Sequence, residues 1–318
     1  MIKKLSIVVS VYNEEQVIDL FYRKITEVLG NVACASEIIY VNDGSVDGSC
    51  EKLMLLAEKN KNIKLINLSR NFGHEAAMIA GIDYSTGDGV LCMDADLQHP
   101  VELIPEIVQR LDDGYEIITM KRISNRGNGF LKKLTSEGFY KVQNFMSDEK
   151  FEENVSDFFA IGRKPAEVLK TQYREKVRFL RGYVQNIGYR KISIEYTARE
   201  RAAGKSKYSI KKLLDFSVNA LLNFSNKPLK IAGYCGLFSA FLGIVVMIYT
   251  IYSRFQKGTP TGYATIIVVI CFMFSILFLL LGVMGEYIGI IFLEVKNRPV
   301  YIVAQTKNID GEKNTNDI

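Results

Sequence analysis

Residues 5–12 read Leu-Ser-Ile-Val-Val-Ser-Val-Tyr and run directly into Asn13-Glu14-Glu15. The apolar run is short, and no small-residue cleavage site follows it, so it predicts a buried strand and not a signal peptide. Outward from it, apolar runs alternate with helical patterns. The predicted strands are Leu5–Tyr12, Glu37–Asn42, Ile63–Leu68, Gly89–Met93 and Glu116–Met120. The predicted helices are Gln16–Leu29, Gly48–Asn60, His74–Tyr84 and Val101–Asp112.

Strand–helix alternation at this spacing is typical of an α/β fold, in which helices cover both faces of a mostly parallel sheet. Ligands of such folds bind beyond the carboxyl ends of the strands. Polar groups follow four predicted strands at that point: Asn13-Glu14, Asn42-Asp43, Ser69-Arg70 and Asp94–Asp96. We therefore expect one site along this edge. No GxGxxG motif follows the first strand, which excludes a dinucleotide-binding oxidoreductase of that type.

The composition favours a globular protein with an appendage. The 318 residues suffice for one catalytic domain and an additional segment. Hydrophobic residues make up 48% and charged residues 24%, which are globular values and not those of a disordered chain. Five scattered cysteines without CxxC spacing favour a reducing compartment over a disulfide or metal framework.

Positive charge is concentrated ahead of the apolar C-terminal third. Residues 163–212 hold 15 Lys/Arg and 4 Asp/Glu, a local net charge of +11, so the rest of the chain must sum to −6 to give the total of +5. A basic block at this position favours contact with anionic headgroups or a phosphorylated lipid, and a solvated basic face is the alternative. Nucleic acid is not an expected partner, because the block adjoins membrane segments.

The C-terminal third predicts a membrane anchor. Apolar residues at helical spacing over Ser209–Asn226, with lysines at the start, favour an amphipathic interfacial helix over an ordinary surface helix. The uncharged runs Ile231–Tyr252 and Thr259–Gly285 have 22 and 27 residues, and about 20 suffice to span a bilayer. Lys and Arg flank the outer ends more than the short loop between the runs, which predicts that both ends lie in the cytoplasm.

These observations predict a multi-pass protein of the inner (cytoplasmic) membrane. Its expected parts are a cytoplasmic catalytic domain over 1–208, an amphipathic juxtamembrane segment over 209–230, a two-helix transmembrane domain over 231–293 and a cytoplasmic tail over 294–318.

The chemistry-bearing motif is Asp94-Ala95-Asp96-Leu97-Gln98, directly after a predicted strand. Two carboxylates at this spacing can converge on a hard cation such as Mg²⁺ or Mn²⁺, whose shell a diphosphate would complete. Such a cation neutralises charge that develops on a departing diphosphate. An isolated pair of this kind is more often a solvated turn, so the motif depends on its neighbours.

Those neighbours resemble a known family. VVSVYNEE over 8–15, VNDGS over 41–45, LSRNFG over 68–73 and DADLQHPVE over 94–102 are similar to family 2 glycosyltransferases of the dolichol-phosphate mannose synthase type. The resemblance is strongest to bacterial polyprenyl-phosphate glycosyltransferases with two C-terminal transmembrane helices. It continues through Ser156–Phe158 with Arg163, Arg201–Lys207, Gly285–Tyr287 and Arg298-Pro299. Two positions depart from it: His74 stands where relatives often carry Lys, and Ile290 where they often carry Arg.

The resemblance implies a GT-A nucleotide-sugar-binding domain and an inverting transfer of a hexosyl group. The donor would be UDP-glucose or UDP-N-acetylglucosamine, the acceptor undecaprenyl phosphate, and the product a polyprenyl-phosphate-sugar for cell-envelope glycosylation. Further expected partners are membrane lipids, a homo-oligomer such as a tetramer, and a downstream flippase or membrane glycosyltransferase.

The resemblance also assigns roles residue by residue. Nucleotide binding falls on Tyr12, Asn13, Glu14, Asp43 and Asp94; metal binding on Asp94, Asp96 and Gln98; phosphate or acceptor binding on Arg201, Ser206 and Lys207; and catalysis on Asp96, Asp157 and Arg201. Asp157 as a helix cap, and Arg201 and Lys207 as membrane-surface charges, are the alternatives. A lipid phosphate has a second pKa near ~6 and is already a nucleophile at neutral pH, so both an orienting and a deprotonating role stay open for Asp157.

Three rival functions fit less well. A processive polysaccharide synthase would need a QxxRW motif, and the chain has no Trp. A transferase acting on another sugar or on a protein leaves the basic motif and the interfacial helix without a purpose. A catalytically inactive scaffold would have no need for intact Asp94, Asp96 and Gln98.

Overall fold

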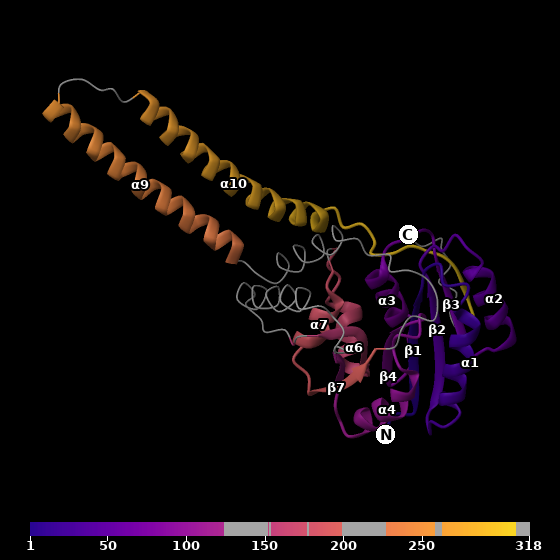
Figure 1. Ribbon diagram of the computed structural model, residues 1–318. Helices are drawn as coiled ribbons and strands as arrows, with labels where there is room; N and C mark the ends of the chain where they lie inside the picture. The colour runs from indigo at the N-terminus through magenta and orange to yellow at the C-terminus, as the bar shows by residue number, and fades with distance from the viewer. Residues whose placement is uncertain (124–151, 153, 177, 199–226, 258–262, 310–318) are drawn as a thin grey trace. The chain divides into compact units, whose positions relative to one another are not determined.

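The computed structural model describes residues 1–123, 152, 154–176, 178–198, 227–257 and 263–309 (Figure 1). The chain divides into two compact units, and we describe each by itself. The first comprises the described parts of 1–138, 151–209 and 299–318, and the second those of 139–150 and 210–298.

The first unit is built on an eight-stranded sheet with the order β7-β5-β6-β4-β1-β2-β3-β8. The central strands β4, β1, β2 and β3 are parallel, as are β5 and β7, whereas β6 and β8 run antiparallel to their neighbours. All five predicted strands are present, and the sheet is mostly parallel as predicted. The strands are β1 (Lys4–Val11), β2 (Ala35–Asn42), β3 (Ile63–Leu68), β4 (Gly89–Asp94), β5 (Ile117–Ile123), β6 (Val155–Gly162), β7 (Lys191–Thr197) and β8 (Val303–Lys307).

Helices cover both faces of this sheet. Successive side chains of a strand point to opposite faces, and on β1 the residues Leu5, Ile7 and Val9 share one buried core with α1, α2 and α4. Val8 faces the other way, toward α3, where a Cβ added to Gly81 would lie 2.1 Å from the Val8 side chain. The helices are α1 (Ile18–Leu29), α2 (Ser49–Lys59), α3 (His74–Asp83), the 3-10 turn η1 (Val101–Leu103), α4 (Ile104–Asp112), α6 (Arg163–Thr171) and α7 (Leu180–Asn186).

The eighth strand was not predicted. Residues 294–318 were expected to form a tail, and within this segment residues 303–307 pair with β3 at the edge of the sheet. The hydroxyl of Tyr301 donates to Asp83 at 2.7 Å, and the side-chain amide of Asn308 donates to the carbonyl of Ile63 at 2.8 Å. Because backbone pairing and side-chain anchors hold this edge strand, its sequence needs no apolar run. Apolar runs were the signal from which the other strands were predicted.

The part of the second unit that the structure describes contains two long helices, α9 (Lys227–Lys257) and α10 (Tyr263–Val295). Both are long and apolar enough to cross a membrane, over Leu229–Val246 and Phe272–Val295. Pro228 lies in the first turn of α9, where proline is tolerated. The second predicted run ended at Gly285, yet α10 continues ten residues further because a glutamate such as Glu286 ends an uncharged run but not a helix. The predicted interfacial helix over 209–226 lies outside the described residues.

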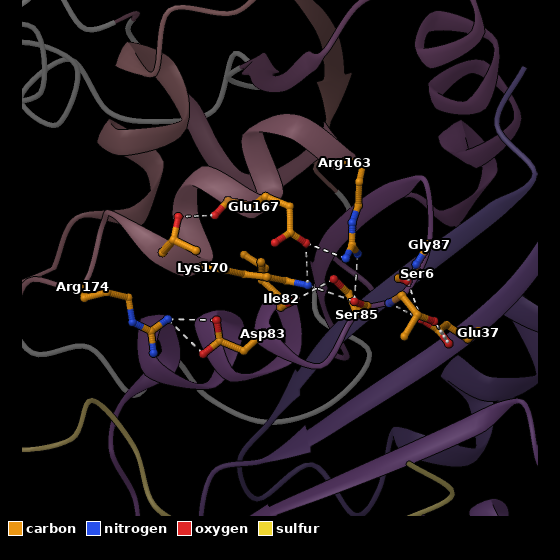
Figure 2. A network of polar contacts seen from close by, with 12 residues as sticks. Ser6, Glu37, Ile82, Asp83, Ser85, Gly87, Arg163, Glu167, Lys170 and Arg174 are labelled. Atoms are coloured by element: carbon orange, nitrogen blue, oxygen red, sulfur yellow. Dashed lines mark hydrogen bonds and ion pairs between the residues drawn. The ribbon is translucent and has the colours of Figure 1, made fainter. Parts of the chain in front are cut away.

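A buried polar network closes the edge of the sheet where the strands begin. The Glu37 carboxylate, whose side chain is 3% exposed, lies 2.6 Å from the Lys4 Nζ and 2.9 Å from the Lys64 Nζ. Burial alone would raise its pKa, but hydrogen bonds from Lys4, Ser6 and Lys64 lower the pKa to about 2. Figure 2 shows Ser6 and Glu37 beside the turn at Ser85. The carbonyl of Ser85 accepts hydrogen bonds from Arg163 and Lys170 at 3.1 and 3.0 Å.

Candidate active site

The DADLQ motif forms a strained turn at the end of β4. Leu97 has a φ of +61°, a conformation that costs a bulky residue roughly 1–2 kcal/mol. The turn is held in part by Asp96, whose Oδ1 accepts the backbone N–H of Gln98 at 3.0 Å. Strain of this kind gathers at functional sites. The turn sets the Asp94 and Asp96 carboxyl groups at the end of the strand, with the Asp94 side chain 31% exposed.

Asp94 faces a histidine across the first strand. The Ser10 hydroxyl donates to Asp94 Oδ1 at 3.1 Å, and the His74 Nδ1 lies 2.9 Å from the Ser10 oxygen and 3.4 Å from Asp94 Oδ1. Burial works to lower the pKa of His74, but the surrounding carboxylates, Asp94 and Asp157 first, raise the pKa above its usual value. His74 therefore favours a positive charge at the position where the resembled family often carries Lys.

A second histidine supports the turn from behind. The backbone N–H of Asp94 donates to the His99 Nδ1 at 3.1 Å. The His99 ring stacks on Phe158 with centroids 4.9 Å apart, and Tyr196 meets it edge-on at 6.2 Å. Burial lowers the pKa of His99, which favours the neutral ring that can accept this hydrogen bond. The sequence analysis gave His99 no chemistry, and its contacts are those of a packing residue.

Asp157 reaches the same edge because β6 runs antiparallel to β4. The register pairs Gly89 with Gly162 and Cys92 with Phe159, so Asp157, two residues before Phe159 on β6, lies toward the end of β4 that carries Asp94. The Asp157 Oδ1 lies 3.7 Å from the Nε of Arg181, which belongs to α7. The tertiary structure thus brings Asp157, more than sixty positions beyond Asp94 in the sequence, to the edge that carries the DADLQ motif.

The motifs after β1 and β2 bind each other. Asn13, with a φ of +54°, accepts the backbone N–H of Val46 at 2.8 Å and donates its own N–H to the Ser45 hydroxyl at 2.9 Å. The N–H of Glu14 donates to the Ser49 hydroxyl at 2.9 Å. These contacts fix the two loops at the carboxyl edge of the sheet. Nucleotide binding by Tyr12, Asn13 and Glu14 stays a prediction.

Asp43 organises the LSRNFG motif. Its two carboxylate oxygens accept the backbone N–H groups of Phe72 at 2.7 Å and Gly73 at 3.0 Å. Gly44 follows at a φ of +65°, and a Cβ there would lie 2.4 Å from the carbonyl carbon of Arg70, so only glycine fits. Burial raises the pKa of Asp43 despite its two hydrogen bonds. A contact from Asp43 to the base of a nucleotide would have to use a carboxylate oxygen that already accepts a backbone N–H from Phe72 or Gly73.

The carboxyl edge is suited to a divalent cation only together with a substrate. In the part of the chain that the structure describes, no group of three or more His, Cys, Asp or Glu side chains is arranged to hold a metal. Mg²⁺ commonly binds one or two carboxylates and completes its shell with water and substrate phosphate oxygens. Asp94 and Asp96, with Gln98 beside them, fit that donor set once a diphosphate is bound. The predicted phosphate-binding residues Arg201, Ser206 and Lys207 lie outside the described residues.

Two charged residues of this edge escaped the sequence analysis. Glu75 lies in the first turn of α3 and Arg181 in α7, and both contribute to the electrostatic surroundings of Asp157. Arg181 was one of fifteen cations in the basic block, with nothing to distinguish it from the others. Glu75 directly follows the LSRNFG motif and His74, and that adjacency was the available signal.

Comparison with known proteins decides the family. Residues 6–169, more than half of the chain, match the model of the family described as Glycosyl transferase family 2. The chain is a family 2 glycosyltransferase. Residues 227–291 of this glycosyltransferase match a second model, the GtrB C-terminal hairpin, which coincides with α9 and most of α10.

Relatives span nearly the whole glycosyltransferase. It is 40% identical over 309 residues to the Uncharacterized glycosyltransferase YkcC of Bacillus subtilis (strain 168), covering 97% of this chain and 95% of that one. It is 36% identical over 304 residues to the SfII prophage-derived bactoprenol glucosyl transferase of Shigella flexneri, covering 95% and 98%. Identity to the Prophage bactoprenol glucosyl transferase homolog of Escherichia coli (strain K12) is 35% over 305 residues, 96% and 99% of the two chains. The family, the GT-A domain and the two apolar C-terminal helices are thus as predicted.

Proposed function

We propose that this glycosyltransferase moves a hexosyl group from a UDP-sugar, UDP-glucose or UDP-N-acetylglucosamine, to undecaprenyl phosphate with inversion. The observation that carries the acceptor is the match of 227–291 to the GtrB C-terminal hairpin on a family 2 catalytic domain. Relatives at 35–36% identity whose printed names are bactoprenol glucosyl transferase, or a homolog of one, support the same acceptor class. A basic block before the hairpin supplies charge for a phosphorylated lipid.

The proposed reaction needs positioning more than base catalysis. A phosphate oxygen of the acceptor attacks the anomeric carbon, the bond from that carbon to the UDP oxygen breaks, and UDP leaves with the bonding electrons. Because a phosphomonoester is largely dianionic above pH ~6, the acceptor requires no strong general base. Asp157, on the strand next to the one that ends at Asp94, orients the acceptor, while the loops at Asn13 and Asp43 hold the nucleotide.

A divalent cation belongs to this proposal. Asp94 and Asp96, with Gln98, would hold Mg²⁺ or Mn²⁺ against the donor diphosphate. When bound, the cation neutralises charge on the leaving group. His74 lies 3.4 Å from Asp94 Oδ1, so its imidazole contacts the same carboxylate that the metal would use. Arg201, Ser206 and Lys207 would approach the phosphates from a segment outside the described residues.

A donor panel tests the reaction. Purified protein is incubated with undecaprenyl phosphate, Mg²⁺ and either UDP-glucose, UDP-N-acetylglucosamine or a related donor, and lipid-linked sugar is measured by mass spectrometry. We expect one donor to give a product, and excess EDTA to abolish its formation. Free UDP without lipid-linked sugar for every donor would contradict the proposed acceptor, and full activity in EDTA would contradict the metal.

The proposed location is the inner membrane with both chain ends in the cytoplasm. Single cysteines in a cysteine-free background, at Thr261 between the helices and at Asn314 near the C-terminus, test this with an impermeant maleimide. Only the cysteine at Thr261 should react in intact cells. Labelling at Asn314 from outside would overturn the orientation and leave the proposed reaction intact.

A further inference from the structure

Residues 300–308, which we call the C-terminal strap, are bonded to the first unit along their whole length. The strand β8 within the strap pairs with β3. At one end the Tyr301 hydroxyl donates to Asp83 Oδ2 at 2.7 Å, and at the other the Asn308 side-chain amide donates to the carbonyl of Ile63 at 2.8 Å. Backbone pairing and a side-chain anchor at each end thus hold the strap.

Asp83, the last residue of α3, is a firm attachment point for the strap. Nη1 of Arg174 donates to both carboxylate oxygens of Asp83 at 2.9 Å (Figure 2). The Asp83 side chain is only 16% exposed. Buried charges cost free energy unless they are paired, so Arg174 allows Asp83 to stay ionised and to accept the Tyr301 hydroxyl as well.

The strap also contacts the donor side of the candidate site. The backbone N–H of Ser69, in the LSRNFG motif, donates to the carbonyl of Ile302 at 2.9 Å. Ser69 directly follows β3 at the carboxyl edge of the sheet. Further along the same loop, the N–H groups of Phe72 and Gly73 donate to Asp43. The LSRNFG loop is therefore bonded to the strap at its start and to Asp43 at its end.

The strap begins shortly after a candidate membrane span. The span in α10 ends at Val295. Asn297 follows with a φ of +42°, a left-handed conformation that commonly ends a helix, and only Arg298 and Pro299 separate it from the strap. The seven residues from Val295 to Ile302 extend over at most about 25 Å. The chain itself thus keeps Ile302, and the LSRNFG loop bonded to it, within about that distance of the end of the span.

We propose that the C-terminal strap is a tether that keeps the nucleotide-binding edge of the sheet close to an acceptor at the membrane surface. The inference rests on the proposed function, because it assumes a lipid phosphate whose tail stays in the bilayer. Such a phosphate cannot leave the headgroup layer, so the catalytic edge has to stay near it. A short link raises the effective concentration of the two partners, which falls roughly as the −3/2 power of linker length. An edge strand with a structural role alone would need its pairing with β3 but no particular length of link.

Lengthening the link separates tethering from the stability of the sheet. Twelve Gly/Ser residues inserted between Asn297 and Arg298 leave the helix end and the strap contacts in place. The matched control is the same insertion after Asn31, an exposed turn residue between α1 and β2. Full-length proteins in phosphatidylglycerol–phosphatidylethanolamine vesicles with undecaprenyl phosphate are assayed for lipid transfer, donor KM and the slow hydrolysis of the donor by water. A short-chain, water-soluble isoprenyl phosphate is the second acceptor.

We expect the insertion after Asn297 to lower transfer to undecaprenyl phosphate about fivefold, because the link grows from seven residues to nineteen. Donor KM, donor hydrolysis and transfer to the water-soluble phosphate should stay within about twofold of wild type. The insertion after Asn31 should leave all of these unchanged. Unchanged lipid transfer, or an equal loss with the water-soluble acceptor, would overturn the inference. If the short-chain phosphate is no substrate, an equal loss of donor hydrolysis overturns it.

Releasing the strap gives a second test that does not depend on the insertion. Tyr301→Phe combined with Asn308→Ala removes both side-chain anchors and leaves Asp83 paired with Arg174. Hydrogen–deuterium exchange over 300–308 should become faster, and lipid transfer should fall relative to donor hydrolysis. Faster exchange with an unchanged ratio of the two rates would overturn the tether. If the double variant does not fold, the insertion decides.

A distance measurement separates the tether from the proposed acceptor. Spin labels are placed on cysteines at Val295 and at Val46, on the loop after β2, in a cysteine-free background; these side chains are 79% and 87% exposed. The distance distribution should be narrow and should broaden with the insertion after Asn297. Equal widths would overturn the tether whichever acceptor the enzyme uses. Wild-type protein that transfers nothing to undecaprenyl phosphate, with a distribution that broadens, would instead contradict the proposed function and keep the tether.

Discussion

The two edges of the catalytic sheet treat acidic side chains in opposite ways. At the edge where the strands begin, Glu37 has two lysines within 2.9 Å and a pKa of about 2. At the edge where they end, Glu75 lies near Asp157 with a pKa of about 7, and burial raises the pKa of Asp43. Acids paired with cations contribute to stability, whereas acids gathered against one another cost stability and are available to bind a cation.

The largest effect on the transfer rate should come from the edge where the strands end. Asp96→Asn removes half of the carboxylate pair that would hold the metal, and we expect transfer to fall about a thousandfold, or ~4 kcal/mol of barrier. Its control is Asp88→Asn at the other edge, where the carboxylate accepts the N–H groups of Lys3 and Lys4 at 2.7 and 3.1 Å. Initial rates per folded molecule measure both. Near-wild-type transfer by Asp96→Asn would show that the acids at the edge where the strands end are not needed for the reaction.

At the edge where the strands begin, losing an acid should lower the free energy of unfolding and leave the transfer rate unchanged. Glu37→Gln leaves two lysines beside a neutral amide in a buried site, and losing one partner of such a pair costs about 3 kcal/mol. Denaturation in detergent measures the loss, and specific activity at low temperature should be unchanged. The exposed Glu106→Gln in α4 should cost less than about 1 kcal/mol. Equal losses in the two variants would show that the Glu37 network contributes no more than a surface pair.

Acid should weaken the same network in a defined range. The folded pKa of Glu37, about 2, is below its ordinary value of 4.5, so its contribution is present above pH 4.5 and is lost as the pH falls toward 2. At pH 3 the loss should be about 2 kcal/mol. Comparing wild type with Glu37→Gln between pH 6 and 3 isolates this residue, because the other carboxylates are common to both. Parallel stability curves would contradict the lowered pKa.

The smallest effect should come from Arg201, a cation expected to act on the phosphates at the edge where the strands end. Arg201 lies outside the described residues, in the basic block before the hairpin, where it could hold the donor and acceptor phosphates together. Arg201→Lys keeps the charge and loses the fork, so we expect transfer to fall about tenfold, or ~1.4 kcal/mol. Donor hydrolysis, which needs no lipid phosphate, should change less. Equal transfer rates would make Arg201 a surface charge.

The strands of the central sheet could be predicted because their signal is local. Buried parallel strands such as Ile38–Val41 and Leu91–Met93 are continuous apolar runs, and polar motifs directly follow them. The rule that ligands bind at the carboxyl edge then directs attention to Asn13, Asp43 and Asp94. β8 carried no such signal, because an edge strand is held by backbone pairing and by Tyr301 and Asn308.

By itself the sequence determined the α/β class, the apolar hairpin and the DADLQ motif, since each depends on residues that are adjacent or periodic. Only the tertiary structure decided which distant charges meet. The antiparallel course of β6 brings Asp157 to the end of β4 that carries Asp94, and Arg181 of α7 and Glu75 of α3 lie around it. Likewise Lys4, Glu37 and Lys64 form one buried network because three parallel strands begin at the same edge. Charge–charge contacts act through space and leave no period in the sequence, which is why the fold had to supply them.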